Sequence, residues 1–171
     1  DARRRFRGRF EVSGSFDLSR VTGSAEAIAR TQRDPVHLYQ RPDGSLAYDP
    51  ARTSLTGTNL ELRFAQVGGE RLRFETAYQR RTPGFEINDV GFLPRTDAIS
   101  THAVLQYRDT DKKKYWREMG GWAGKYQNWN FDRDLTANGV APLYIPPGYS
   151  HFGTVEVDGV SGKPITAKVK Y

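Results

Sequence analysis

The sequence contains no cysteine, so neither a disulfide framework nor a thiolate metal site can form. It also lacks any run of about 18 apolar residues, which excludes a membrane-spanning helix but is compatible with the half-apolar strands of a membrane β-barrel. Its 171 residues fit one domain, and an aromatic content of 12% is high for a disordered chain. A start without Met or a signal sequence predicts a processed product or a piece of a longer protein.

Motifs for catalysis and metal binding are missing as well. His37, His102 and His151 are far apart in the sequence, and none has a partner at ligand spacing. No zinc-protease, EF-hand, Walker or nucleophile-elbow motif occurs. The Asp-x-Asp pairs at 109–111 and 132–134 are more typical of turns than of calcium sites. We therefore expect no enzyme, no cofactor and no metal.

The charge balance is mildly basic, with 26 Lys and Arg against 20 Asp and Glu. Such an excess is compatible with nucleic acid or anionic lipid, and two segments mix cations with aromatics, at 3–10 and 112–116. The first alternates as an amphipathic strand does, and the second is typical of a soluble hairpin tip. We therefore expect no nucleic-acid partner.

What the chain does contain is strict alternation. In "RFRGRFEVSGSFDL", residues 5–18, even positions are apolar or glycine and odd positions are charged or polar. This pattern predicts one strand of 14 residues with an apolar and a polar face. The usual strand in globular proteins has about 5–6 residues.

The next segment, residues 21–30, has small residues on alternate positions, which favours a strand. A helix is the competing interpretation, because good helix formers follow Ala25 and Glu26 and Arg30 can form an ion pair one turn apart. Pro and Gly between 34 and 58 predict turns and a long loop.

Further along, residues 59–64 and 71–78 predict a hairpin whose Gly68-Gly69 pair suits a two-residue turn. Residues 98–109 and 115–131 predict the next antiparallel strands, with a bulge or bend at Gly120-Gly121. The fold class is therefore all-β, an antiparallel meander of hairpins.

We expect one β unit over residues 1–134. Residues 135–171 form a Pro- and Gly-rich C-terminal segment with two candidate short strands, in the same domain or closing a barrel. Alternation fits a soluble β-sandwich, with the apolar face on a core, and also an outer-membrane barrel, with that face on lipid. The long first strand, the Arg-rich polar face and aromatics near strand ends favour the barrel.

Aromatic residues concentrate between 115 and 129. Trp116, Trp122 and Trp129 are candidates for a sugar-stacking platform, for an aromatic girdle at a membrane interface, or for plain core.

The run "TPGFEINDVGF", residues 82–92, follows a predicted strand, and an Arg and an Asp follow it before the next one. With the upstream segment around His37, Gln40, Arg41 and Pro42 and the later "YQNWNF", it resembles a family of bacterial outer-membrane proteins, classed as a domain of unknown function. Residues 20–134 resemble the family's C-terminal barrel. The matched motif positions are Pro83, Gly84, Phe85, Glu86, Ile87, Asn88, Asp89, Val90, Gly91, Phe92, Arg95 and Asp97.

The resemblance implies a larger barrel than this chain supplies. Members of that family carry an N-terminal β-sandwich similar to carbohydrate-binding module family 9, and this chain has no such sandwich. A chain of 171 residues supplies roughly eight crossings. We therefore expect the rest of a longer polypeptide, or further copies, as partners, together with outer-membrane lipid and, through an attached module, carbohydrate.

For the motif itself we expect a structural corner. Pro83 and Gly84 would break the strand, and Glu86, Asn88 and Asp89 would hydrogen-bond the loop backbone, with Arg81 or Arg95 balancing charge. The apolar members, Phe85, Ile87, Val90 and Phe92, would pack the loop onto the sheet. The alternatives are a ligand or calcium loop, or a catalytic acid or base at Glu86 or Asp89.

These observations predict a non-enzymatic segment of a barrel in the bacterial outer membrane, serving as a pore, an anchor or a platform for an attached binding domain. A soluble carbohydrate-binding β-module, periplasmic or extracellular, is the second hypothesis. A secreted hydrolase is the third.

Overall fold

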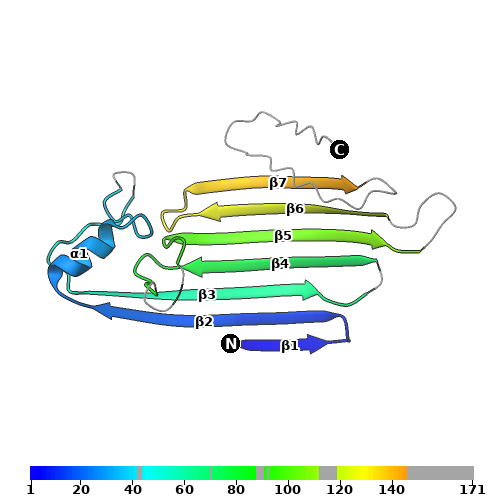
Figure 1. Cartoon of the computed structure of the whole chain (residues 1–171), viewed down its shortest axis with the longest axis horizontal. Helices are drawn as coiled ribbons and strands as arrows, with labels where there is room; N and C mark the ends of the chain where they lie inside the picture. The colour runs from blue at the N-terminus through cyan, green and yellow to red at the C-terminus, as the bar shows by residue number, and fades with distance from the viewer. Residues whose placement is uncertain (42–43, 70, 88–90, 92, 112–118, 146–171) are drawn as a thin grey trace.

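A computed structural model describes residues 1–41, 44–69, 71–87, 91, 93–111 and 119–145. Seven antiparallel strands form one sheet in which each strand lies beside the next in the chain (Figure 1). The expected all-β antiparallel meander is confirmed. The strands are β1 (Ala2–Phe6), β2 (Phe10–Thr22), β3 (Ser54–Gln66), β4 (Leu72–Arg81), β5 (Ala98–Asp109), β6 (Met119–Trp129) and β7 (Leu135–Ile145), and the helix is α1 (Ala25–Arg33).

The single strand predicted for residues 5–18 is wrong, because the chain turns back at Arg7–Arg9. Arg7 and Gly8 have φ angles of 51° and 64°, a left-handed pair that glycine makes accessible. Phe6 then pairs with Phe10 across the turn. Because paired residues share a face, the alternation continues through the hairpin, and only the turn residues leave it.

The strand predicted for residues 21–30 is also wrong beyond Thr22, where the competing helix forms. Ser24 caps α1, since its hydroxyl accepts a hydrogen bond from the Ala27 N–H at 3.2 Å. Glu26 lies in the first turn and arginines in the last, as the helix dipole favours. Ile28 is buried on the inner side of the helix.

Three other boundaries differ from expectation. β3 ends at Gln66 and β4 begins at Leu72, so the connection is longer than a two-residue turn. No register shift occurs at Gly120-Gly121; the irregularity between β6 and β7 is at Asn128 and Trp129. β7 extends the sheet into the C-terminal segment, whose two candidate short strands lie at 146–171, outside the described residues.

The sheet has two unlike faces. Cross-strand pairs such as Phe16 with Leu60, and Asp17 with Asn59, keep apolar residues together on one side and polar residues on the other. The apolar face carries Phe6, Phe10, Val12, Phe16, Leu18, Leu60, Leu62, Phe64, Leu72, Phe74, Ile99, Leu105, Tyr107 and Val140. In the described strands, the same face also carries four cations, Arg4, Arg20, Arg80 and Lys125. The polar face carries Arg3, Arg5, Glu11, Ser13, Ser15, Asp17, Ser19, Glu61, Arg63, Arg73, Glu75, Gln79, Arg81, Ser100, His102, Gln106 and Arg108.

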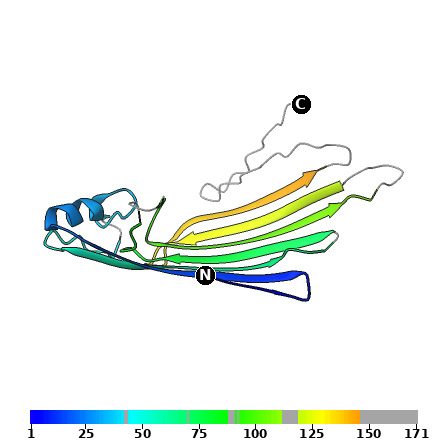
Figure 2. The same ribbon diagram turned by 60° about the horizontal axis from the view of Figure 1, so that its bottom comes forward.

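The small hydrophobic core lies on the polar face, at the end of the sheet that carries α1. Ile28, Tyr39 and Leu55 form it, and Val21 and Leu46 pack against it. Burial raises the pKa of Tyr39. Figure 2 shows α1 and the β4–β5 connection on the same side of the curved sheet.

Within the described residues, no helix has the length and the apolar content needed to cross a membrane.

Candidate functional site

The β4–β5 connection, residues 82–97, is docked onto the polar face by direct backbone contact. A Cβ atom at Gly57 would lie 2.1 Å from the Phe85 nitrogen, and one at Gly84 would lie 2.4 Å from the Thr56 carbonyl oxygen. Two glycines therefore allow the two backbones to touch. Phe85 is only 2% exposed as a result.

Hydrogen bonds fix the start of the same connection. The Thr82 N–H donates to the Thr58 carbonyl at 2.9 Å, and the Thr58 N–H donates to the Thr82 hydroxyl oxygen at 2.7 Å. The Glu86 N–H donates to the Ser19 hydroxyl oxygen on β2 at 2.9 Å. The connection thus holds both β2 and β3.

His37, in the β2–β3 connection, contacts the β4–β5 connection through both ring nitrogens. Its ring is fully buried: Nδ1 lies 2.8 Å from the Pro83 carbonyl oxygen, and Nε2 lies 2.7 Å from the Glu86 carboxylate. A carbonyl only accepts, so Nδ1 is the donor to Pro83. The Thr96 hydroxyl donates to the Val36 carbonyl and contacts Nδ1 at 3.2 Å.

Several predicted corner residues lie in this arrangement, but with other partners. Pro83 and Gly84 follow directly after β4, as expected. The Glu86 carboxylate, which was predicted to bond the loop backbone, has His37 as a partner. Arg81 donates to the Arg95 carbonyl at 2.8 Å.

The remaining corner residues are placed as follows. The Gly91 N–H donates to the Ile87 carbonyl at 2.8 Å. Asp97 is buried with a φ of 50°, and its carboxylate accepts a hydrogen bond from the Phe131 N–H at 3.0 Å. The other predicted positions, Asn88, Asp89, Val90 and Phe92, lie outside the described residues.

The β2–β3 and β6–β7 connections are tied together at the same end. The Ser45 hydroxyl and the Ser45 N–H, the latter at 2.9 Å, donate to the Asp132 carboxylate. These two hydrogen bonds hold the pKa of Asp132 below its ordinary value. Arg41 lies 3.8 Å from Asp97. All three connections at the α1 end are therefore joined to one another.

Ion pairs cross the polar face from β1 to β5. The Glu11 carboxylate accepts from Arg5 at 2.8 Å and from Arg63 at 3.2 Å. Arg63 also donates to Glu75 at 2.8 Å, and Glu75 lies 3.3 Å from His102. Glu11 and Glu75 are each paired with cations. Such pairing favours a structural role for these carboxylates over acid–base chemistry.

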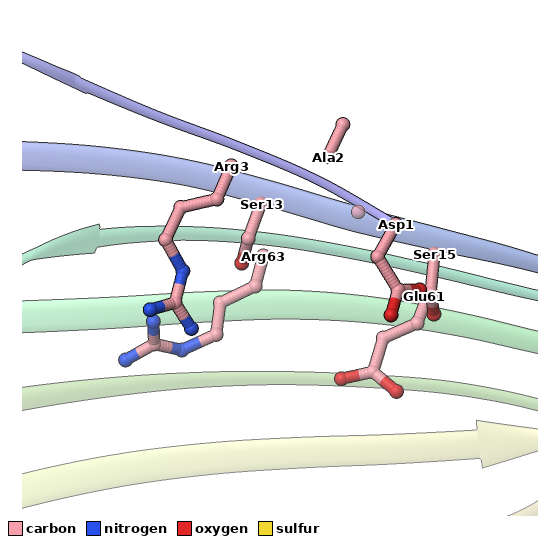
Figure 3. Close-up of a pocket in the computed structure, with 8 residues that line it drawn as sticks. Asp1, Ala2, Arg3, Ser13, Ser15, Glu61 and Arg63 are labelled. Atoms are coloured by element: carbon pink, nitrogen blue, oxygen red, sulfur yellow. The ribbon is translucent and has the colours of Figure 1, made fainter.

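The polar face is also where the hollows lie. One of about 410 Å³ is bordered by β1, β2 and β3, and Figure 3 shows Arg3 and Arg63 side by side there with Glu61 beyond them. A second, of about 390 Å³, is bordered by Arg73 and Gln106 among others.

The structure separates two members of the predicted tryptophan platform. Trp122 pairs with Gln106 on the polar face, whereas Trp129 pairs with Ile99 on the apolar face. Because they lie on opposite faces, the two rings cannot stack on one ligand. Trp116 lies outside the described residues.

No group of His, Cys, Asp or Glu in the described part of the chain could hold a metal ion. Asp109 and Asp111 instead hold Arg71, 3.5 Å from Asp109. The hydrogen bond with Asp111 raises the pKa of Arg71, with a further contribution from Asp109. The Asp134 N–H donates to the Asn130 side chain at 2.8 Å, as in a turn.

Comparison with known proteins places this sheet in a family. The model that matches residues 11–142 is described as Domain of unknown function (DUF5916), and the chain belongs to that family. The match runs from the start of β2 into β7 and includes α1 and the docked connection. No curated protein and no solved structure matches the chain.

Proposed function

We propose that this chain is a section of a bacterial outer-membrane β-barrel whose apolar face contacts lipid and whose polar face lines an aqueous interior. Its role is non-enzymatic: a pore, an anchor or a platform for an attached binding domain. One observation carries the proposal. The helix and the docked connection lie on the polar face at the α1 end, and the described residues form no second layer on the apolar face (Figure 2).

The exposure of that face is difficult to reconcile with water. Phe16 is 64% exposed and Leu18 is 68% exposed, and further large side chains beside them are exposed as well. Burying each such side chain is worth about 1.5–3 kcal/mol. In a sandwich a second sheet would cover this face, whereas the second layer formed by the described residues lies on the charged side (Figure 2).

Strand length supports the same proposal. Strands β2 to β7 hold 10 to 13 residues each. A tilted membrane crossing needs about 9–11. On β2, the eight residue steps from Phe10 to Leu18 cover about 26 Å along the strand. At a tilt of about 40°, roughly 20 Å remains along the membrane normal, close to the apolar band of about 25 Å on such barrels.

The proposal also requires partners. In lipid every backbone polar group must be paired within protein. Among the described strands, β1 and β7 each have a neighbour on one side only. Additional strands, from the rest of a longer polypeptide or from further copies, would close the barrel.

A soluble carbohydrate-binding β-module is the second candidate. The observation that favours it is Lys125, which pairs with Ala103 and Val140 on the apolar face near the middle of β6. A lysine there is costly against lipid. Arg80 lies on the same face of β4, where it pairs with Leu60 and Ile99. The proposal of lipid contact is therefore strongest for the middle of β2 and β3.

A charge placed on the apolar face tests the proposal. Leu62 is 48% exposed, so in water the Leu62→Arg variant should lose less than about 0.5 kcal/mol of unfolding free energy. Against lipid the same change should cost about 2–4 kcal/mol. The measurement is equilibrium unfolding by urea in phospholipid vesicles.

The matched control is Gln79→Arg, which puts the same charge on the polar face opposite Glu61. We expect this variant to keep the parent stability. Equal, small effects for both variants would contradict lipid contact.

A further inference from the structure

Four phenylalanines form a cluster on the apolar face at the end of the sheet opposite α1. The ring centroids of Phe6 and Phe10 lie 5.6 Å apart, those of Phe6 and Phe64 6.2 Å apart, and those of Phe64 and Phe74 5.2 Å apart. We call this end, with the β1–β2 and β3–β4 turns, the hairpin end. Aromatic side chains gathered at the ends of amphipathic strands are typical of a membrane–water boundary.

Three arginines surround the cluster. Arg7 and Arg9 lie in the β1–β2 turn, and Arg4, which pairs with Val12, lies on the apolar face of β1 one step in from the rings. All three are exposed. No acidic side chain among the described residues pairs with any of them.

The turn that carries these arginines is held in place. The Arg9 carbonyl accepts hydrogen bonds from the Val67 N–H at 2.8 Å and from the Gly68 N–H at 3.1 Å. A Cβ at Gly68 would lie 3.0 Å from the Gly8 carbonyl oxygen, so the two turns are packed closely. The cationic group is therefore presented at a fixed place beside the phenylalanine cluster.

Another arginine at this end, Arg71, is neutralised by ion pairs within the chain. Arg71 is held by Asp109 and Asp111. The described acids of the opposite end, such as Asp97 and Asp132, lie in the connections near α1. The hairpin end thus carries positive charge that no described acid pairs with, and this charge adjoins the apolar face.

We propose that the hairpin end binds the phosphate groups of anionic lipids through Arg4, Arg7 and Arg9, with the phenylalanine cluster just inside the acyl region. This inference rests on the proposed membrane function. Guanidinium groups bind phosphate oxygens in two-point fashion, and a long side chain such as Arg4 extends along apolar surface to reach the headgroups. The ligand class is a phospholipid with a net negative headgroup.

The test compares lipid selectivity in vesicles of phosphatidylcholine that contain spin-labelled phosphatidylglycerol or spin-labelled phosphatidylcholine. The parent protein should immobilise the anionic label preferentially. The triple variant Arg4→Gln, Arg7→Gln, Arg9→Gln should lose that preference by at least about fivefold, since each basic residue near an anionic surface contributes about that factor. The control triple Arg30→Gln, Arg33→Gln, Arg133→Gln, with the same charge change on α1 and in the β6–β7 connection, should keep it.

An unchanged preference in the first triple would overturn the inference. So would a preference that inorganic phosphate abolishes and chloride at equal ionic strength does not, because the ligand would then be free phosphate. A protein that inserts into neutral vesicles without selectivity contradicts this inference alone. A protein that fails to insert contradicts the proposed function.

Discussion

Replacing Gly57 with alanine is expected to release the β4–β5 connection from the sheet. The new methyl group would lie 2.1 Å from the Phe85 nitrogen and 2.5 Å from the Gly84 carbonyl carbon, and both are backbone atoms that cannot turn aside. We expect a loss of at least about 3 kcal/mol, at the upper end for an overpacked site. Hydrogen exchange resolved by peptide would show residues 82–97 and α1 exchanging faster.

The control for this variant lies in the same connection. Among the described residues, a Cβ at Gly91 would meet only the Ile87 Cδ1 atom, at an ordinary 3.6 Å, so Gly91→Ala should leave exchange nearly unchanged. Protection of residues 82–97 that survives Gly57→Ala would mean that the connection does not dock through this contact.

Removal of the His37 ring is the second change with a large expected effect. His37→Ala leaves the Pro83 carbonyl and the Glu86 carboxylate without the buried partner that each now has. Breaking a buried pair of this kind costs about 3–5 kcal/mol. We expect the α1 end to open before the rest of the sheet, which tryptophan fluorescence and exchange during urea unfolding would separate.

Two variants calibrate that result. His102→Ala removes the other histidine–glutamate pair, which is largely exposed, and should cost less than about 1 kcal/mol. Glu86→Gln keeps a donor for Nε2 of a neutral imidazole and should be milder than His37→Ala. If His37→Ala lost as little unfolding free energy as His102→Ala, the buried His37 contacts with Pro83 and Glu86 would not hold the connection.

The sequence predicted the sheet better than its ends. Residues 98–109 were expected as a strand and are β5, because alternation records directly which face each residue occupies. The turn at Arg7–Arg9 was not predicted, because apolar residues occupy even positions both before and after it. Phe6 and Phe10 therefore share a face whether the chain runs straight or folds back. The helix after Ser24 depended on capping, which alternation does not weigh.

The centre of the docked site was the least visible part. The Pro83-Gly84 break was foreseen from backbone chemistry alone. His37 and Glu86 lie 49 residues apart, and no local spacing joins them. The only signal for His37 was its place in the segment that resembles the family, without a role. Likewise, Gly57 becomes necessary only once another backbone lies against it.

The two faces connect these findings to the proposed function. Polar side chains, the core and the docked connection all occupy the side that a barrel would enclose. The opposite side presents exposed Phe16, Leu18 and Leu62 to its surroundings. A barrel would explain both observations, because it would enclose the polar face with the docked connection and turn the apolar face toward lipid.

The most direct measurement uses the absence of cysteine, which makes single-cysteine labelling clean. Phe16→Cys and Asp17→Cys, adjacent on β2 but on opposite faces, would each carry an environment-sensitive fluorophore in protein reconstituted into vesicles. The account predicts that a nitroxide on lipid chains quenches the label at position 16 and spares the one at 17, while aqueous iodide does the reverse. Iodide quenching at both positions, without any effect of the lipid nitroxide, would contradict it.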